Sequence, residues 1–361
     1  MIRVLVVDDS LTVRKRLVDV LGSDPELAVV GEAGDGPEAI ELCKRLRPDV
    51  MTLDMMLPTM NGLAVTEHIM AFFPTPIVIV SSSMNRGELF KTYDALAAGA
   101  VEVLDKPGAT EPADDWERRL VALVKLVSRI KVVSHPRGRL GHNRLSLAPR
   151  PRAEAQPLPF PTRSESSYEL VAIGTSTGGP NALVDVLRGL PATFPLPILV
   201  VIHIGRPFAA GFAEWLAAQS QVRVSIAVDG AALPRRGQPS VLIAPPDVHL
   251  VVRNRVLRLT SDPERHSCRP SVDVLFESIA LELGATAIAC VMTGMGRDGA
   301  EGLRAIHRAG GMTIAQDERT SVVFGMPREA IALGAAKRVL ALHEIGPALL
   351  HLAIEPVSAL A

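Results

Sequence analysis

The chain has 361 residues, of which 48% are hydrophobic and 21% are charged, and its formal net charge is −1. At about 150 residues per domain, this length predicts two or three domains, and the composition excludes a chain that is disordered throughout. The nearly balanced charge gives no indication of nucleic acid or an anionic membrane surface as the main partner.

Three features of the sequence indicate where the protein resides. The cysteines, Cys43, Cys268 and Cys290, are widely spaced and show no metal-binding pattern, which is typical of reduced cytosolic thiols. The first ten residues, MIRVLVVDDS, carry carboxylates where a signal peptide needs an apolar segment. No apolar run approaches the ~18 residues of a membrane span. We therefore expect a cytoplasmic protein without membrane insertion.

Residues 1–130 alternate short β-rich runs with helical patterns. The predicted strands are Ile2–Val7, Ala28–Glu32, Val50–Asp54, Ile77–Ser81 and Val101–Leu104, and the predicted helices lie near 12–21, 36–46, 62–72, 86–98 and 114–130. Five β–α units with short connections predict a parallel, doubly wound sheet. Ligands of such sheets bind beyond the carboxyl ends of the strands.

Polar side chains stand at those strand ends. They are Asp8 and Asp9 after the first strand, Asp54 at the third, Ser81 at the fourth and Lys106 after the fifth. Converging carboxylates repel one another unless a cation lies among them, and oxygen ligands suit Mg²⁺. A lysine and a hydroxyl opposite them bind phosphoryl oxygens, so an aspartate that accepts a phosphoryl group is a coherent chemistry. Each residue alone could be a solvated strand end, a helix cap or a surface lysine, but their joint placement favours a site.

This pattern resembles the receiver domain of response regulators, through VVDDS, TLDMMLP, VSSS and DKP. The resemblance implies a flavodoxin-like receiver domain over residues 1–130, phosphorylated on Asp54 by a histidine kinase. By the same resemblance, Mg²⁺ would be held by Asp8, Asp9, Asp54 and the Met56 carbonyl, and the phosphoryl group would contact Ser81 and Lys106. It also implies a cis Lys106–Pro107 bond, a form that costs only ~0.5–1 kcal/mol before proline.

Residues 131–167 interrupt the alternation. His135–Ser167 contains six prolines, scattered arginines and few apolar residues. This composition is typical of a semi-extended linker. The arginines could instead form a docking patch, but we interpret the segment as a tether between two domains.

From residue 168 to 355, β-rich and helical runs alternate again and predict a second doubly wound, mostly parallel α/β domain. The predicted strands are Tyr168–Gly174, Pro197–His203, Arg223–Val228, Ser240–Ala244, Ala287–Thr293 and Met312–Gln316, and the predicted helices are Ala209–Ala218, Val272–Leu283, Ala300–Ala309 and Pro327–Leu333. Two further runs, His249–Val252 and Val256–Thr260, predict a β-hairpin.

The first strand of this domain leads into the turn GTSTGG, and Pro180 then opens a helical pattern. Ser176 lies between Gly174 and Gly178, the G-x-S-x-G spacing that exposes a nucleophilic serine on a strand-to-helix turn. Backbone N–H groups at such a helix start can stabilise an oxyanion. The turn could instead bind a phosphate, although it lacks the Walker lysine and the full G-x-G-x-x-G pattern, or Ser176 could be only a turn residue.

A serine nucleophile needs a base and an orienting carboxylate. Of the histidines after residue 168, only His203 ends a strongly apolar strand, ILVVIH, while His266 is a weaker loop candidate that could contact substrate. Asp298 follows another apolar strand within GMGRDGAEG, although Asp298 and Glu301 could equally form a helix capping box. The candidate triad is therefore Ser176, His203 and Asp298.

Four motifs, IGTSTGG, VIH, RPSVDVLF and TGMGRDGAEG, resemble the catalytic domain of the CheB family of chemotaxis methylesterases, in the family's order behind a receiver. The resemblance implies that Ser176 is the nucleophile, His203 the base and Asp298 its orienter, with the Met295 N–H in the oxyanion hole. It implies hydrolysis of γ-methyl glutamate on the cytoplasmic helices of chemoreceptors, and deamidation of receptor glutamines, through an acyl-enzyme and without a cofactor for the esterase reaction. The segment Ile204–Pro207 departs from the family's Met-Pro, so the substrate rim near His203 could differ.

Two other classes of function compete with this reading. A response regulator with a nucleic-acid output would need a helix-turn-helix or a basic face, and the C-terminal half offers neither. A receiver-linked scaffold without catalysis is the second. We expect a monomer that is activated by phosphorylation of Asp54. We also expect the unphosphorylated receiver to cover the Ser176 cleft, because a tether holds two domains with sites at their strand ends close together.

Overall fold

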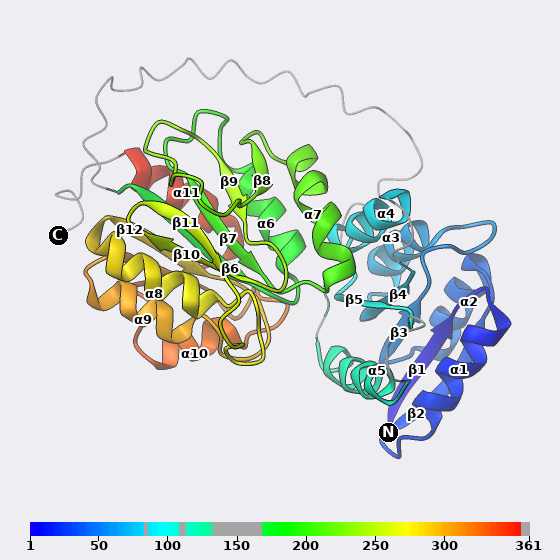
Figure 1. Ribbon diagram of the computed structural model, residues 1–361. Helices are drawn as coiled ribbons and strands as arrows, with labels where there is room; N and C mark the ends of the chain where they lie inside the picture. Colours follow the sequence, from blue (N-terminus) through cyan, green and yellow to red (C-terminus); the bar gives the residue numbers. More distant parts are fainter. Residues whose placement is uncertain (83–85, 108–112, 131, 133–167, 355–361) are drawn as a thin grey trace.

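The computed structural model describes residues 1–82, 86–107, 113–130, 132 and 168–354, which form two α/β units (Figure 1). The N-terminal unit contains β1 (Ile2–Val7), α1 (Leu11–Gly22), β2 (Leu27–Ala33), α2 (Gly36–Leu46), β3 (Val50–Leu53), α3 (Gly62–Phe72), β4 (Ile77–Ser81), α4 (Arg86–Ala97), β5 (Glu102–Asp105) and α5 (Ala113–Val127). Every strand and helix predicted for this unit is present, with ends shifted by a few residues at most.

The five strands of the N-terminal unit are parallel, in the order β2-β1-β3-β4-β5. Side chains alternate between the two faces of a strand. Val4 and Val6 of β1 therefore pack with α1 and α5, whereas Leu5 and Val7 belong to the core that includes α2 and α3. Burial of both faces explains why these strands are apolar along their whole length.

The C-terminal unit contains β6 (Leu170–Thr175), α6 (Gly179–Arg188), β7 (Ile198–Ile202), α7 (Arg206–Gln219), β8 (Val224–Ile226), β9 (Val241–Ile243), β10 (His249–Arg253), β11 (Val256–Thr260), α8 (Val272–Glu282), the 3₁₀ turn η2 (Gly284–Thr286), β12 (Ala287–Val291), α9 (Ala300–Arg308), β13 (Met312–Gln316), α10 (Met326–Ala332), β14 (Arg338–Leu340) and α11 (Leu342–Ile354). The hairpin β10–β11 is present as predicted. Sequence reasoning missed β14, which has only three residues. It placed His343 and His351 in helical patterns but gave no bounds for α11, whose internal Pro347 is normally a sign of a helix end.

Seven strands of the C-terminal unit form one parallel sheet in the order β14-β13-β12-β6-β7-β9-β8. In β6, Val171 and Ile173 pack into the core that includes α6, α7 and α11, while Leu170 and Ala172 pack with α8 and α9 on the other face (Figure 1). Helices thus cover both faces, and the predicted α/β class with doubly wound, parallel sheets is confirmed.

The two units share an interface in which α4 packs against α7 and α6. The Tyr93 ring lies 5.6 Å from the ring of Phe212 and 5.3 Å from that of Trp215. The Tyr93 hydroxyl donates to the Phe208 carbonyl, and Trp215 Nε1 donates to Asp94 Oδ1 over 2.9 Å. One hydrophobic core therefore continues from the N-terminal unit into the C-terminal unit.

The predicted linker, residues 131–167, lies outside the described residues apart from Val132. In the part of the chain that the structure describes, no helix combines the length and the apolar character needed to cross a membrane.

Candidate active site

Ser176 lies in the turn between β6 and α6, at the carboxyl edge of the seven-stranded sheet. Its N–H donates to the Thr293 carbonyl (3.0 Å), and its carbonyl accepts from the Gly179 N–H (2.7 Å), so the turn is held on both sides. Gly178, the N-cap of α6, has a φ of +78°, a conformation that side chains rarely permit. Ser176 itself is half-buried, so it is not sealed inside the core.

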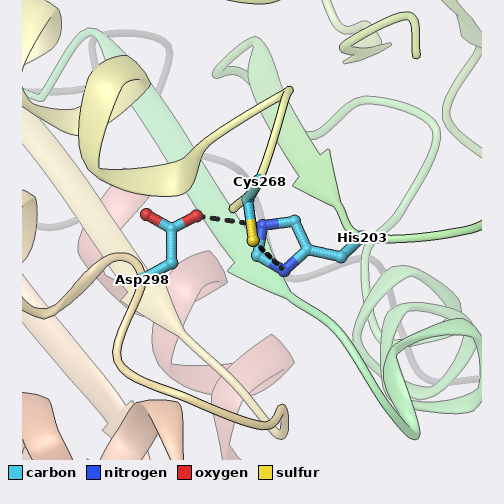
Figure 2. A group of neighbouring side chains, drawn as sticks. All are labelled: His203, Cys268 and Asp298. Atoms are coloured by element: carbon cyan, nitrogen blue, oxygen red, sulfur yellow. Dashed lines mark hydrogen bonds and ion pairs between the residues drawn. The ribbon is translucent and has the colours of Figure 1, made fainter. Parts of the chain in front are cut away.

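The strand order brings the predicted partners of Ser176 to the same edge. β7 and β12 lie on either side of β6, so the loops after these three strands converge. His203 follows β7 and its N–H donates to the Thr175 carbonyl (3.1 Å), while Asp298 lies in the loop after β12. His203 Nε2 is 2.9 Å from Asp298 Oδ2 (Figure 2).

Asp298 is almost completely buried, and its carboxylate accepts four hydrogen bonds. Oδ2 accepts from His203 Nε2 and from the Val272 N–H (2.7 Å), and Oδ1 accepts from Ser271 Oγ (2.7 Å) and from the Asp273 N–H (3.1 Å). Val272 and Asp273 open α8, whose N-terminus favours negative charge. Burial opposes the charged form, but the bonds from His203, Ser271 and the backbone outweigh it and lower the pKa of Asp298.

The capping-box alternative for Asp298 is wrong. The N-cap of α9 is Gly299, and no side chain caps that helix. Instead, Ser271 caps α8 by accepting from the Val274 N–H while its hydroxyl donates to Asp298. Sequence reasoning missed Ser271, although a serine immediately before a helical pattern is a recognised N-cap signal.

Cys268 also belongs to this site, although nothing in its sequence position indicated so. Its Sγ lies 3.8 Å from His203 Nδ1 (Figure 2). Burial favours the neutral imidazole of His203, but the contacts with Asp298 and Cys268 outweigh it and raise the pKa of His203 to about 9. Because Asp298 occupies Nε2, Nδ1 is the nitrogen left to accept a proton. Within the described residues, Ser176 makes no hydrogen bond to His203, and catalytic hydrogen bonds are often long before substrate binds.

The remaining candidates of this domain occupy different places. Gly294 lies against Ser176, since a Cβ at Gly294 would be 2.9 Å from the Ser176 Cβ, and Met295 follows it as an exposed loop residue. His249 is buried and contacts backbone groups through both ring nitrogens, so it supports the fold. His266 lies in the loop that also carries Cys268.

A second cluster of charged groups occupies the carboxyl edge of the N-terminal sheet. One oxygen each of Asp8, Asp9 and Asp54 lies within 4.8 Å of the others. Lys106 Nζ is 2.8 Å from Asp8 Oδ2 and 2.9 Å from Asp54 Oδ2, and the Lys106 N–H donates to the carbonyl of the buried Ser81 (3.0 Å). Burial raises the pKa of Asp8 despite Lys106. The three carboxylates carry more negative charge than one ammonium group can neutralise, and carboxylate oxygens are the ligands that a hard divalent cation such as Mg²⁺ prefers.

Two predictions concern the backbone around this cluster. Met56 lies in the loop after β3, two residues beyond Asp54. Its carbonyl as a metal ligand stays a prediction. The expected cis bond between Lys106 and Pro107 is wrong: among the described residues only Arg269–Pro270 is cis. With a trans Lys106–Pro107 bond, the Lys106 ammonium group still contacts both Asp8 and Asp54.

The N-terminal unit also borders Ser176. A cleft of about 680 Å³ is lined on one side by Ser176, Thr177 and Met295 and on the other by residues of β5 and α5. Thr177 Oγ1 donates to Glu102 Oε2 across the interface (2.7 Å). Desolvation in this interface raises the pKa of Glu102.

Comparison with known proteins identifies both domains. The family model for the CheB methylesterase matches residues 171–349, and the model for the response regulator receiver domain matches residues 4–113. A protein-glutamate methylesterase/protein-glutamine glutaminase of Nitrosospira multiformis is 43% identical over 358 residues, which is 98% of each chain. One from Anaeromyxobacter dehalogenans is 44% identical over 351 residues, 97% of each chain. The solved CheB methylesterase catalytic domain of Thermotoga maritima is 37% identical and covers 51% of this chain and 98% of its own, with a TM-score of 0.49. The chain therefore belongs to the CheB methylesterase family, with a receiver domain preceding its methylesterase domain.

Proposed function

We propose that this chain hydrolyses γ-methyl esters of glutamate side chains in chemoreceptors and deamidates receptor glutamines, and that a histidine kinase supplies the phosphoryl group for its receiver domain. The names of both relatives, protein-glutamate methylesterase/protein-glutamine glutaminase, support this activity. The observation that carries the proposal is the hydrogen bond between His203, which follows β7, and Asp298, which follows β12, on the two strands that flank the Ser176 strand β6.

In this proposal Ser176 Oγ attacks the ester carbonyl carbon while His203 Nδ1 accepts the serine proton. Asp298 holds the imidazole through Nε2 and stabilises its charged form, and the Met295 N–H stabilises the oxyanion. His203 then returns the proton to the leaving methoxide, and methanol departs from the acyl-enzyme. Water, deprotonated by His203, releases the glutamate carboxylate and restores Ser176. With a glutamine substrate the leaving group is ammonia.

Methanol release from methylated receptor membranes tests the activity, and labelling of Ser176 by a fluorophosphonate tests the nucleophile. We expect the wild-type chain to release methanol and to be labelled, and Ser176→Ala to do neither. Methanol release by Ser176→Ala at the wild-type rate would overturn the site. If the wild-type chain is labelled but releases no methanol from any methylated receptor, Ser176 remains the proposed nucleophile and the proposed substrate is wrong.

For the receiver we propose that Asp54 accepts the phosphoryl group. Asp8, Asp9, Asp54 and the Met56 carbonyl would hold Mg²⁺, which neutralises phosphoryl charge when bound. Lys106 already bridges Asp8 and Asp54, and it would turn to the phosphoryl oxygens together with Ser81.

We propose further that the unphosphorylated receiver restricts access to Ser176. The support is the cleft between Ser176 and the β5–α5 face, and the Thr177–Glu102 hydrogen bond one residue from the nucleophile. A covalent tether gives about millimolar effective concentration, so a contact of a few kcal/mol keeps the cleft ~99% closed. A shift of only ~1–3 kcal/mol on phosphorylation then changes the ratio of open to closed molecules 5–150-fold.

Strand β5 provides a direct route for that shift. Glu102 at its start contacts Thr177, and Lys106, immediately after its end, contacts Asp54. A fragment from about residue 160 onward should be faster than the intact, unphosphorylated chain. A slower fragment would make the receiver an activator and would refute its role as a cover.

A further inference from the structure

A second cleft adjoins the catalytic site, and Asp298 and Cys268 form part of its lining. It has a volume of about 560 Å³ and, within the described residues, is lined by the C-terminal unit alone. Met295 borders both this cleft and the one that contains Ser176, so the two are neighbours. Two arginines, Arg297 and Arg328, line the second cleft, and the mechanism above uses neither.

Arg297 is held in place by a chain of hydrogen bonds that begins in the core. The Asp273 carboxylate is fully buried and accepts from the Gly302 N–H through Oδ1 (2.7 Å). Its Oδ2 lies 3.1 Å from His266 Nε2, and Arg297 Nε donates to His266 Nδ1 over 3.2 Å. Because arginine can only donate, Nδ1 must be the accepting nitrogen, and Nε2 therefore carries the proton donated to Asp273.

This arrangement parallels the catalytic pair next to it. Asp298 orients His203 for proton transfer. Asp273 binds His266 through one carboxylate oxygen and the Gly302 N–H through the other, and so orients His266 toward a guanidinium group. His266 and Ser267 both have left-handed φ angles, +53° and +59°. Such conformations are uncommon outside glycine and persist where the surrounding structure imposes them, often at binding sites.

The two arginines of the cleft differ in charge compensation. Arg328 is paired with Glu329, with Nη2 2.9 Å from Oε1. Arg297 is exposed and forms no ion pair with any carboxylate in the described part of the chain. Its Nε donates to His266, which positions the guanidinium group in the lining of the cleft and leaves its two other nitrogens without a carboxylate partner among the described residues.

We propose that Arg297 is a specificity-determining residue that binds a carboxylate of the receptor substrate close to the methyl ester, with His266 as its positioning residue. This inference rests on the proposed function. Arg297 lies two residues after Met295, whose N–H is proposed to face the ester oxygen. On a substrate helix, side chains three or four residues apart have Cβ atoms ~5–6 Å apart, so an acidic neighbour of the esterified glutamate falls in the adjoining cleft. A guanidinium fork matches a carboxylate with two parallel hydrogen bonds.

The test compares two substrates with the full-length chain in the presence of a phosphodonor. One is a receptor cytoplasmic fragment with a γ-methyl glutamate flanked by glutamates three and four residues away, and the other has alanines at those flanking positions. Arg297→Gln should raise KM for the glutamate-flanked fragment on the order of tenfold and leave kcat unchanged, because the contact forms equally in the ground and transition states. It should change neither constant for the alanine-flanked fragment.

Matched variants separate this role from a structural one. Arg328→Gln removes an arginine from the same cleft but one that Glu329 already neutralises, so its effect on KM should be much smaller. Arg297→Lys keeps the charge without the fork and should give an intermediate KM. His266→Ala should raise KM for the glutamate-flanked fragment alone, and it should add nothing in an Arg297→Gln background.

Binding of both fragments to the Ser176→Ala chain gives a readout that does not need turnover. There the glutamate-flanked fragment should bind more tightly, and Arg297→Gln should abolish the difference. Equal effects of Arg297→Gln on both fragments, or no effect on either, would overturn the role of Arg297. Absence of methanol release by the wild-type chain, with the binding difference intact, would instead count against the proposed esterase activity and leave the anion site standing.

Discussion

Tyr93→Phe should raise the basal rate of methanol release by the unphosphorylated chain about 2- to 13-fold. The substitution removes one hydroxyl from the domain interface, where it donates to the Phe208 carbonyl, and leaves the ring against Phe212 and Trp215. One hydrogen bond contributes a net ~0.5–1.5 kcal/mol, here to the stability of the closed arrangement of the two domains. Each ~1.4 kcal/mol changes an equilibrium constant tenfold. If the receiver covers the cleft in most molecules, the open fraction and the basal rate rise by that factor.

The assay is the initial rate of methanol release from methylated receptor membranes, with and without phosphodonor. Under saturating phosphodonor the ratio of the two rates should be smaller, because in the proposed mechanism phosphorylation already opens the cleft in a larger fraction of the molecules. The chain has one other tyrosine, Tyr168, which lies just before β6 at the opposite edge of the sheet from Ser176. Tyr168→Phe removes the same group away from the interface and should leave the basal rate unchanged.

A Tyr93→Phe chain whose basal rate equals that of wild type, or falls below it, would refute the reasoning. Equal rises in Tyr93→Phe and Tyr168→Phe would also refute it, since a general loosening of the fold would then explain the result. Thermal unfolding of both variants identifies that case directly.

The catalytic unit, the general base and the phosphorylation site give three further expectations. Ser176→Ala and His203→Ala should each lower the rate of methanol release by a factor on the order of 10⁴, and the double variant should lose little more, whereas multiplied losses would show independent roles. If neutral His203 is the base, as proposed, its pKa of about 9 means that kcat/KM should increase with pH up to that value. Cys268→Ala removes a contact that raises this pKa, so the rising part of the variant's pH profile of kcat/KM should move to lower pH. An unchanged profile would exclude Cys268 as a cause of the raised pKa. Asp54→Asn should keep the basal rate and lose the response to phosphodonor. Chelation of Mg²⁺ should abolish the same response in the wild type without lowering its basal rate.

Local patterns were enough to predict most of the secondary structure. Strand, turn and helix around Ser176 depend on residues adjacent in the chain, and the G-x-S-x-G spacing placed the serine at the end of β6. The same reasoning placed His203 and Asp54 at strand ends, because parallel strands direct their carboxyl ends to one edge. The chemistry expected of these residues therefore came from position along single strands.

Which strand ends meet is a different question, and only the tertiary structure decided it. The order β12-β6-β7 brings Asp298, Ser176 and His203 to one place, although nothing local to any of these strands encodes its neighbours. The capping box of Asp298 was equally compatible with the sequence. In the structure the carboxylate instead accepts from N–H groups at the N-terminus of α8, a helix distant in the chain.

The same limit applies to the interface and to the residues around His203. Tyr93, Phe212 and Trp215 fit ordinary core positions of their own helices, and only the packing of α4 on α7 shows that they join two domains. Cys268 and His266 lie in an irregular loop whose left-handed residues no periodicity predicts. Contacts between distant segments depend on how whole elements pack, because side-chain complementarity across an interface has no counterpart in the spacing of residues along the chain.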